Sequence, residues 1–175
     1  VKFLQGNSAN EVAANLREAL LSSNGHGAQL GPNNVVVNNS AVAASTTFTF
    51  SGAATNNGTL ALTDAYGTTK TYKAIDSCSD CPKLNSGNIE FNSGNGVSKV
   101  AAANNFVEAV TSSVGHNGTI RAVHTGSGVV VLTQTMSGTV GNTTVTSAAS
   151  WDTACSVNPT NFTSGAGGGD ITITQ

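Results

Sequence analysis

A long internal repeat limits the folds open to this chain more than any other feature of its sequence. Stretches near the start match stretches near the middle in the same order: Val12–Ala14 with Val100–Ala102, Asn15–Leu20 with Asn105–Val110, and Ser22–His26 with Ser112–His116. Further along, Val35–Val37 aligns with Val129–Val131, and Gly58–Thr63 aligns with Gly169–Thr174. The offsets imply a unit of roughly 110 residues, which is a common domain length.

The repeat divides the chain into three parts. We expect the second half of one unit at 1–54, a complete unit at 55–166, and a linker with the first strand of a following unit at 167–175. Both ends of the chain lie within strand-like alternation, so we expect a segment of a longer polypeptide.

The complete unit predicts an α+β fold with the order β-β-β-α-β-β-β, in which one helix packs on a mainly antiparallel sheet. Strands are expected at 58–63 and 68–74, joined as a hairpin by the turn Asp64–Gly67, and at 88–91. Apolar spacing predicts a helix over 97–114 that stops at Gly115. Strands at 119–124, 128–134 and 144–147 follow, and the earlier half-unit predicts a helix from Ser8 or Asn10 to Ser23.

The chain carries very little charge, and this excludes several classes of partner. Charged residues make up 9% of the 175 residues, and the net charge is -2. Such a chain has no basic surface with which to bind nucleic acid or anionic lipid. No apolar run approaches the roughly 20 residues that span a bilayer. We therefore expect no nucleic acid and no membrane among its partners.

Three cysteines, Cys78, Cys81 and Cys155, form the sharpest local motif. A redox CxxC needs a helix N-terminus to lower the thiol pKa, but this segment is predicted to be a loop. A zinc site needs four ligands, and only Cys155 and His124 could complete one. We favour a structural disulfide, either Cys78–Cys81 or one of these two with Cys155, outside a reducing compartment.

The histidines and carboxylates indicate no catalytic, cofactor-binding or metal site. His26 and His116 follow the two helices at the same repeat position, where a histidine can contact the last helix carbonyls and the helix dipole. Glu18 and Glu108 also recur, but each is expected to face solvent. The remaining notable carboxylates are Asp64 and Asp152 in predicted turns, and Asp76 and Asp80 beside the cysteines, where they could bind Ca²⁺ only weakly.

Two phrases of the complete unit, Leu60–Tyr72 and Val131–Val145, are separated by an alanine-rich helix, and Phe162–Gly168 closes the unit. This order resembles tandem modules in the structural proteins of tailed bacteriophages, especially marine and cyanobacterial phages, where tail fibres and capsid decoration proteins carry such units. The resemblance implies a β-rich virion protein. The cysteine loop near Cys78–Cys81 departs from the usual module.

These observations predict a non-enzymatic structural or assembly module, located in a virion or outside the cell. Its partners would be copies of itself or other virion or surface proteins, and a glycan on a host surface suits its neutral exterior. The same composition also fits a repeat of a bacterial surface adhesin or of a surface-layer or filament protein. An enzyme acting on polysaccharide would need two facing carboxylates, which the repeat does not provide.

Overall fold

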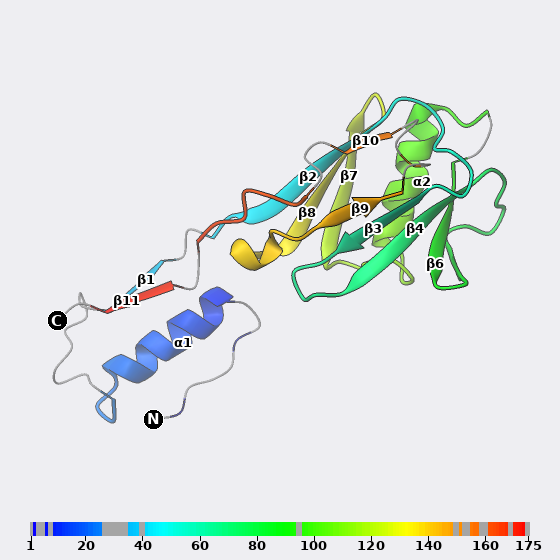
Figure 1. Cartoon of the computed structure of the whole chain (residues 1–175). Coiled ribbons are helices and arrows are strands. Elements are labelled where there is room, and N and C mark those ends of the chain that lie inside the picture. Colours follow the sequence, from blue (N-terminus) through cyan, green and yellow to red (C-terminus); the bar gives the residue numbers. More distant parts are fainter. Residues whose placement is uncertain are drawn as a thin grey trace.

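The structure is a computed structural model that describes residues 2, 6, 9–25, 35–38, 41–93, 96–148, 151, 155–157, 161–167 and 170–173. It has two parts, which lie at opposite ends of the molecule in Figure 1. We call the described residues of 41–167 the head. We call the group formed by α1 (Ala9–Leu21), β1 (Val35–Asn38) and β11 (Asp170–Ile173) the base.

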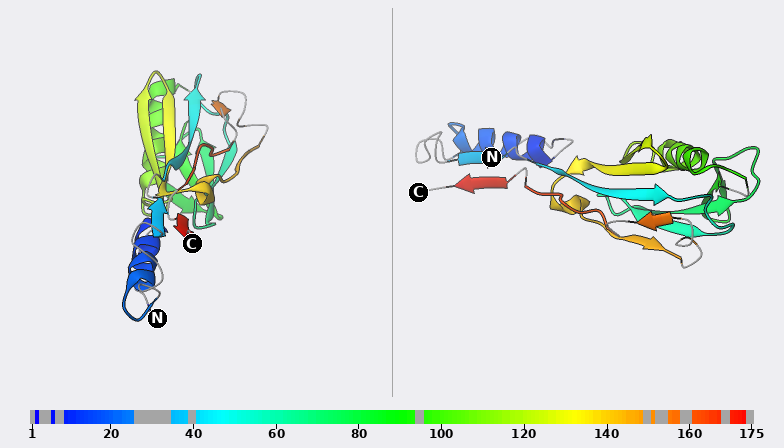
Figure 2. Two further views of the ribbon diagram at one scale, coloured as in Figure 1. Left: turned by 90° about the vertical axis from the view of Figure 1, so that its left-hand side faces the viewer. Right: turned by 90° about the horizontal axis from the view of Figure 1, so that it is seen from above.

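The head contains two sheets and one long helix. The first sheet has the strand order β10-β2-β8-β7 and the second has the order β5-β6-β4-β3-β9. The elements, in chain order, are β2 (Ala43–Phe50), β3 (Thr59–Thr63), β4 (Thr69–Ile75), β5 (Lys83–Asn85), β6 (Asn88–Asn92), α2 (Lys99–Thr111), β7 (Ile120–Gly126), β8 (Val129–Ser137), the 3-10 helix η1 (Thr139–Gly141), β9 (Val145–Ser147) and β10 (Cys155–Val157). Figure 2 shows α2 lying along the sheets rather than across their ends.

The predicted α+β class is confirmed, and so is the predicted hairpin around the turn Asp64–Gly67. β3 and β4 pair antiparallel around Asp64, whose side chain accepts hydrogen bonds from the amides of Tyr66 and Thr68. These bonds satisfy the backbone of the turn locally, which is why an aspartate stands there.

The head contains strands that were not predicted, and one of its strand pairs is parallel. β2 lies within the range assigned to the first unit, yet it pairs with β8 and β10 of the head. β5 forms within the stretch expected to be a loop, and β10 forms where an irregular segment was expected. β4 and β6 pair in parallel, with β5 on the far side of β6. Short polar strands such as β5 form because a neighbour satisfies their backbone, and their own sequence gives no periodic signal.

Aromatic side chains hold the two sheets and α2 together. Phe106 of α2 is fully buried, and its ring lies 5.5–5.9 Å from the rings of five partners. These partners are Phe48, Phe50, Tyr72, Phe91 and Trp151. Small residues on the same face of α2, such as Ala102 and Ala103, let the helix approach the sheets closely. The alternation of buried and partly exposed residues along β2 and β3 supplies the rest of this core.

The base is much smaller than the head. β1 and β11 form a two-stranded antiparallel sheet, and α1 packs beside it. The Nε of Arg17 donates a hydrogen bond of 2.9 Å to the carbonyl oxygen of Val35, which ties α1 to β1. α2 is placed differently in the head, since it packs mainly on β7, β6 and β2.

We predict that Phe106→Ala lowers the free energy of unfolding of the head by about 3–5 kcal/mol, because the cavity removes ring contacts to both sheets. The matched control is Val100→Ala on the same helix, where the side chain is 41% exposed and the loss should stay within about 0.5 kcal/mol. Urea denaturation followed by Trp151 fluorescence measures both changes. Equal losses in the two variants would contradict the central role of Phe106.

Candidate functional site

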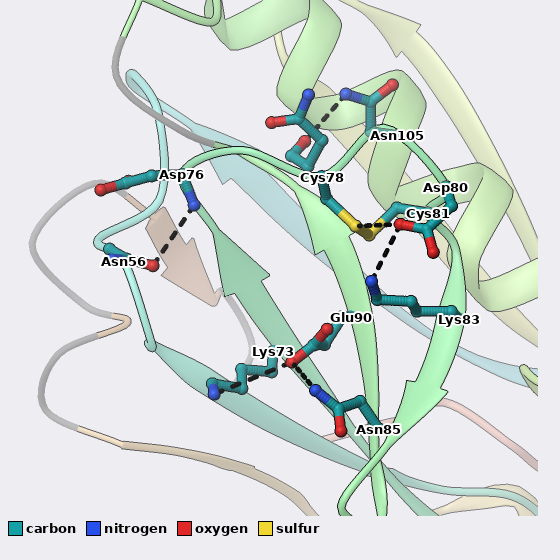
Figure 3. Close-up of a disulfide and its surroundings, with 11 residues drawn as sticks. Asn56, Lys73, Asp76, Cys78, Asp80, Cys81, Lys83, Asn85, Glu90 and Asn105 are labelled. Carbon is teal, nitrogen blue, oxygen red and sulfur yellow. Dashed lines mark hydrogen bonds and ion pairs between the residues drawn. A yellow bond between two sulfur atoms is a disulfide. The ribbon is translucent and has the colours of Figure 1, made fainter.

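The structure joins Cys78 to Cys81 in a disulfide at the end of the β4–β5 connection, with the two Cα atoms 5.6 Å apart (Figure 3). The side chain of Cys155 lies outside the described residues. The disulfide borders a pocket of about 120 Å³, which is small beside the 300–1,000 Å³ typical of sites for drug-sized ligands. The pocket is lined by Cys78, Cys81, Pro82, Phe91, Asn92, Asn105 and Glu108.

The carboxylates near the cysteines form ordinary surface contacts. Asp80 accepts a hydrogen bond of 2.8 Å from the Nζ of Lys83, and this contact holds the pKa of the Asp80 carboxyl below its usual value. Asp76 is exposed, and its amide donates to the side chain of Asn56. Asp152 lies outside the described residues. Within the described part of the chain, no three His, Cys, Asp or Glu side chains gather where they could hold a metal ion.

His116 is placed differently from the prediction. It is buried, and its two ring nitrogens have partners on β4 and in the turn before β4 rather than on α2. Its Nδ1 lies 2.6 Å from the hydroxyl of Tyr72, and its Nε2 lies 3.4 Å from the carbonyl oxygen of Thr68. Burial lowers the pKa of His116 and raises that of Tyr72. The prediction that this histidine caps the helix is therefore wrong, and His26 lies outside the described residues.

Lys70 contacts the turn that follows α2, which ends at Thr111. Its Nζ donates to the carbonyl oxygen of Val114 at 3.0 Å and also to that of Gly115. Lys70 lies in β4, more than 40 residues away in the sequence. Sequence reasoning missed it because the contact depends on how β4 packs against the helix end.

The turn that follows the helix is the same in the head and in the base. In the head, the Ser112 hydroxyl donates to the carbonyl of Ala109, and the Gly115 amide donates to the carbonyl of Ser112. In the base, Ser22 bonds to Ala19 in the same way, and Gly25 bonds to Ser22. A Cβ at either glycine would overlap two carbonyl oxygens of the preceding helix. The glycine is therefore needed for close approach, which explains why the Ser-x-x-Gly spacing occurs twice.

The two repeated glutamates, Glu18 and Glu108, are both exposed on their helices. Glu18 contacts Arg17 at 3.2 Å, and its side chain is 77% exposed. They lie on separate parts of the molecule and do not form a facing pair.

Antiparallel pairs form on both sides of the junction between the head and the base, and we call these paired segments the ribbon. Val35 pairs with Ile173 and Asn38 pairs with Asp170 in the base, while Val42 bridges Ala166 and Ser45 bridges Thr163 at the edge of the head. All four pairs keep one antiparallel register. The amide of Val42 donates to Ala166 at 2.7 Å, and the amide of Ser45 donates to Thr163 at 2.9 Å. The segments entering and leaving the head therefore run side by side, as the right-hand view of Figure 2 also shows.

In comparisons with known proteins, the chain matches no protein-family model and shows no significant similarity to a curated protein or to a solved structure. None of the described helices is long and apolar enough to cross a membrane.

We predict that Gly115→Ala and Gly25→Ala each cost about 1–3 kcal/mol of stability in their own part of the molecule, because the new methyl group collides with backbone carbonyls. Gly52→Ala is the control, since a Cβ there meets no atom within 4 Å. Hydrogen exchange of the α1 and α2 amides measures the two effects separately. If Gly25→Ala left the exchange of α1 unchanged, the shared turn geometry would be contradicted.

We also predict that the free energy of unfolding falls as the pH drops below the ordinary histidine pKa of 6.5. The folded state holds His116 neutral, whereas the unfolded chain takes up a proton near pH 6.5, so acid favours unfolding. The stabilising contribution is complete above pH 6.5 and is lost as the pH falls toward the lowered pKa of the folded state. Urea titrations between pH 5 and 7.5 measure the slope, and His116→Gln should flatten it; an unchanged slope would show that another group is responsible.

Proposed function

We propose that this chain is a non-enzymatic structural module of a virion or extracellular protein, in which the base attaches to neighbouring proteins and the head projects from it. The in-register ribbon carries this proposal. A domain whose entering and leaving strands pair with one another is held at the end of a two-stranded stalk. Domains strung in a line instead have their entry and exit at opposite ends. The geometry therefore favours a projecting module, as in a capsid decoration or a side domain of a fibre.

The small size of the base supports a role in attachment. A two-stranded sheet with one helix is marginally stable by itself in water. Unprotected sheet edges pair readily with strands of other chains, and charged residues, the usual protection, are rare here. Contacts with copies of the chain, or with other virion or surface proteins, would supply the burial that the base lacks.

We also propose that the base is part of a second copy of the fold seen in the head. The identical helix-end turns support this, and so does the strand register. β11 matches β3 in sequence, with Ile171 and Ile173 in place of Leu60 and Leu62. Leu62 pairs with Val145 of β9, and Ile173 pairs with Val35 of β1. On this register, Val35 corresponds to Val145 rather than to Val129, so the repeat would be nested: one copy inserted between two strands of another.

The disulfide and the neutral surface agree with the proposed location. Disulfides persist in oxidising surroundings, which include virions and cell surfaces. A surface with few charges cannot steer ionic ligands over a distance, whereas it can pack against similar subunits or contact a neutral glycan.

Two variants of the whole chain test whether the ribbon is needed for self-association while the head stays folded. Val42→Pro removes the amide that bonds Ala166, whereas Val42→Thr keeps it; the side chain is 51% exposed, so little packing changes. We predict that the wild type and Val42→Thr associate as the concentration rises, and that Val42→Pro stays monomeric. Sedimentation velocity measures association, and near-ultraviolet circular dichroism checks that the head is intact.

Two results would contradict the proposal. A wild-type chain that sediments as a monomer at every concentration would show that the base does not bind copies of itself, and failure to bind isolated virion or cell-surface components would extend this to other partners. Unchanged association of Val42→Pro would show that the ribbon does not position the attachment surface.

A further inference from the structure

A lysine, a glutamate and an asparagine from three neighbouring strands meet on the second sheet of the head (Figure 3). The Nζ of Lys73 on β4 lies 3.9 Å from the Oε1 of Glu90 on β6. The Nδ2 of Asn85 on β5 donates a hydrogen bond of 2.9 Å to the same oxygen. An amine and a carboxamide thus approach one carboxylate oxygen from two sides.

This arrangement contains the groups that an amide exchange between side chains requires. An unprotonated lysine amine is a nucleophile, the Cγ of a carboxamide is an electrophile, and a carboxyl group between them can transfer the protons. The carbonyl oxygen of Asn85 also accepts a hydrogen bond of 3.3 Å from the Ser86 hydroxyl, which would stabilise the negative charge that develops on it during attack.

The surroundings of the carboxylate suit the reaction. The side chain of Glu90 is only 7% exposed and that of Lys73 is 26% exposed, so bulk water is partly excluded from the proton-transfer path. Lys83 also lies opposite Glu90 in the sheet, but its Nζ is engaged by Asp80. The chain therefore offers one lysine poised beside Glu90 and a second nearby that is held elsewhere.

We propose that Lys73 and Asn85 are a site of covalent cross-linking, in which an isopeptide bond forms with the assistance of Glu90. Glu90 accepts a proton from the Lys73 ammonium, and the flexible lysine chain moves its Nζ onto the Cγ of Asn85. The Nζ–Cγ bond forms, the Cγ–Nδ2 bond breaks, and Glu90 returns the proton to the departing nitrogen. Ammonia leaves and takes up the second proton from the Nζ, so neither an oxidant nor another reactant is required.

The bond would join β4 to β5 across β6 and would close the connection that carries the disulfide. β5 is a three-residue edge strand with the exposed Leu84 at its centre, and its backbone pairs with β6. A covalent link there would prevent the edge from separating under load. This inference does not depend on the proposed attachment role, because it concerns the head alone.

The experiment is an intact-mass measurement of the reduced wild-type chain and three variants. We expect the wild type to lie below its sequence mass by one ammonia. Lys73→Arg keeps the positive charge but removes the amine nucleophile, and Glu90→Gln removes the proton carrier, so both should retain the full mass. Lys83→Arg is the matched control and should lose ammonia as the wild type does. Circular dichroism confirms that each variant is folded.

Peptide mapping locates the bond, because a succinimide at an Asn-Gly sequence such as Asn117–Gly118 would lose the same mass. Trypsin does not cleave after an acylated lysine, so the cross-link would leave the peptide 71–83 joined to the peptide 84–99. Recovery of the two peptides separately, with cleavage after Lys73, would overturn the proposal, as would a full-length mass equal to that of the sequence. Loss of ammonia in Lys73→Arg would also overturn it.

Discussion

The packing of Phe106 between two sheets is the interaction on which the rest of the structure depends. The chain has few aromatic residues with which to fill a core, and most of them pack around Phe106. Phe106 touches rings from β2, β4 and β6, as well as Trp151, so a single residue of α2 connects both sheets. Alanines around it give the helix the close approach that these contacts require.

The ribbon leads directly into this core. β2 begins at the end of the ribbon and belongs to the sheet that packs under α2, so the stalk is continuous with a core strand. In the attachment role that we propose, force applied to the base would pass along hydrogen-bonded backbone into the sheet of β2 and β8. A connection through a flexible linker would not hold the head at a defined angle.

The disulfide and the proposed cross-link lie away from that connection, around the β4–β5 segment. The disulfide and the Lys73, Glu90 and Asn85 group surround an edge strand that its own sequence would hold weakly. Edge strands expose unpaired backbone groups and are the places where sheets open or add further strands. The described residues of the base hold no such disulfide, which supports the attachment role that we propose for it.

Elements with a local signal could be predicted from the sequence. The hairpin at Asp64–Gly67 follows from a turn whose aspartate bonds the backbone of the turn. The existence of α2 follows from apolar spacing, although the helix spans Lys99–Thr111 rather than the predicted 97–114. Elements stabilised from a distance could not be predicted. β5 and β10 form because neighbours satisfy their backbone. The side chain of His116 faces Tyr72 of β4, and Lys70 of the same strand bonds to the turn after α2.

The sequence by itself predicted an α+β chain in which a helix and its terminal turn occur twice, and the structure has both. Hydrophobic periodicity and turn-forming residues act over a few positions, so they can be recognised in the sequence without knowledge of the tertiary structure. The tertiary structure alone decided that 35–38 pairs with 170–173 and that Val42 bridges Ala166, and it alone brought Lys73, Asn85 and Glu90 together. Those contacts depend on strand order and register, which are set by the burial of both sheets around Phe106 and leave no local pattern in the chain.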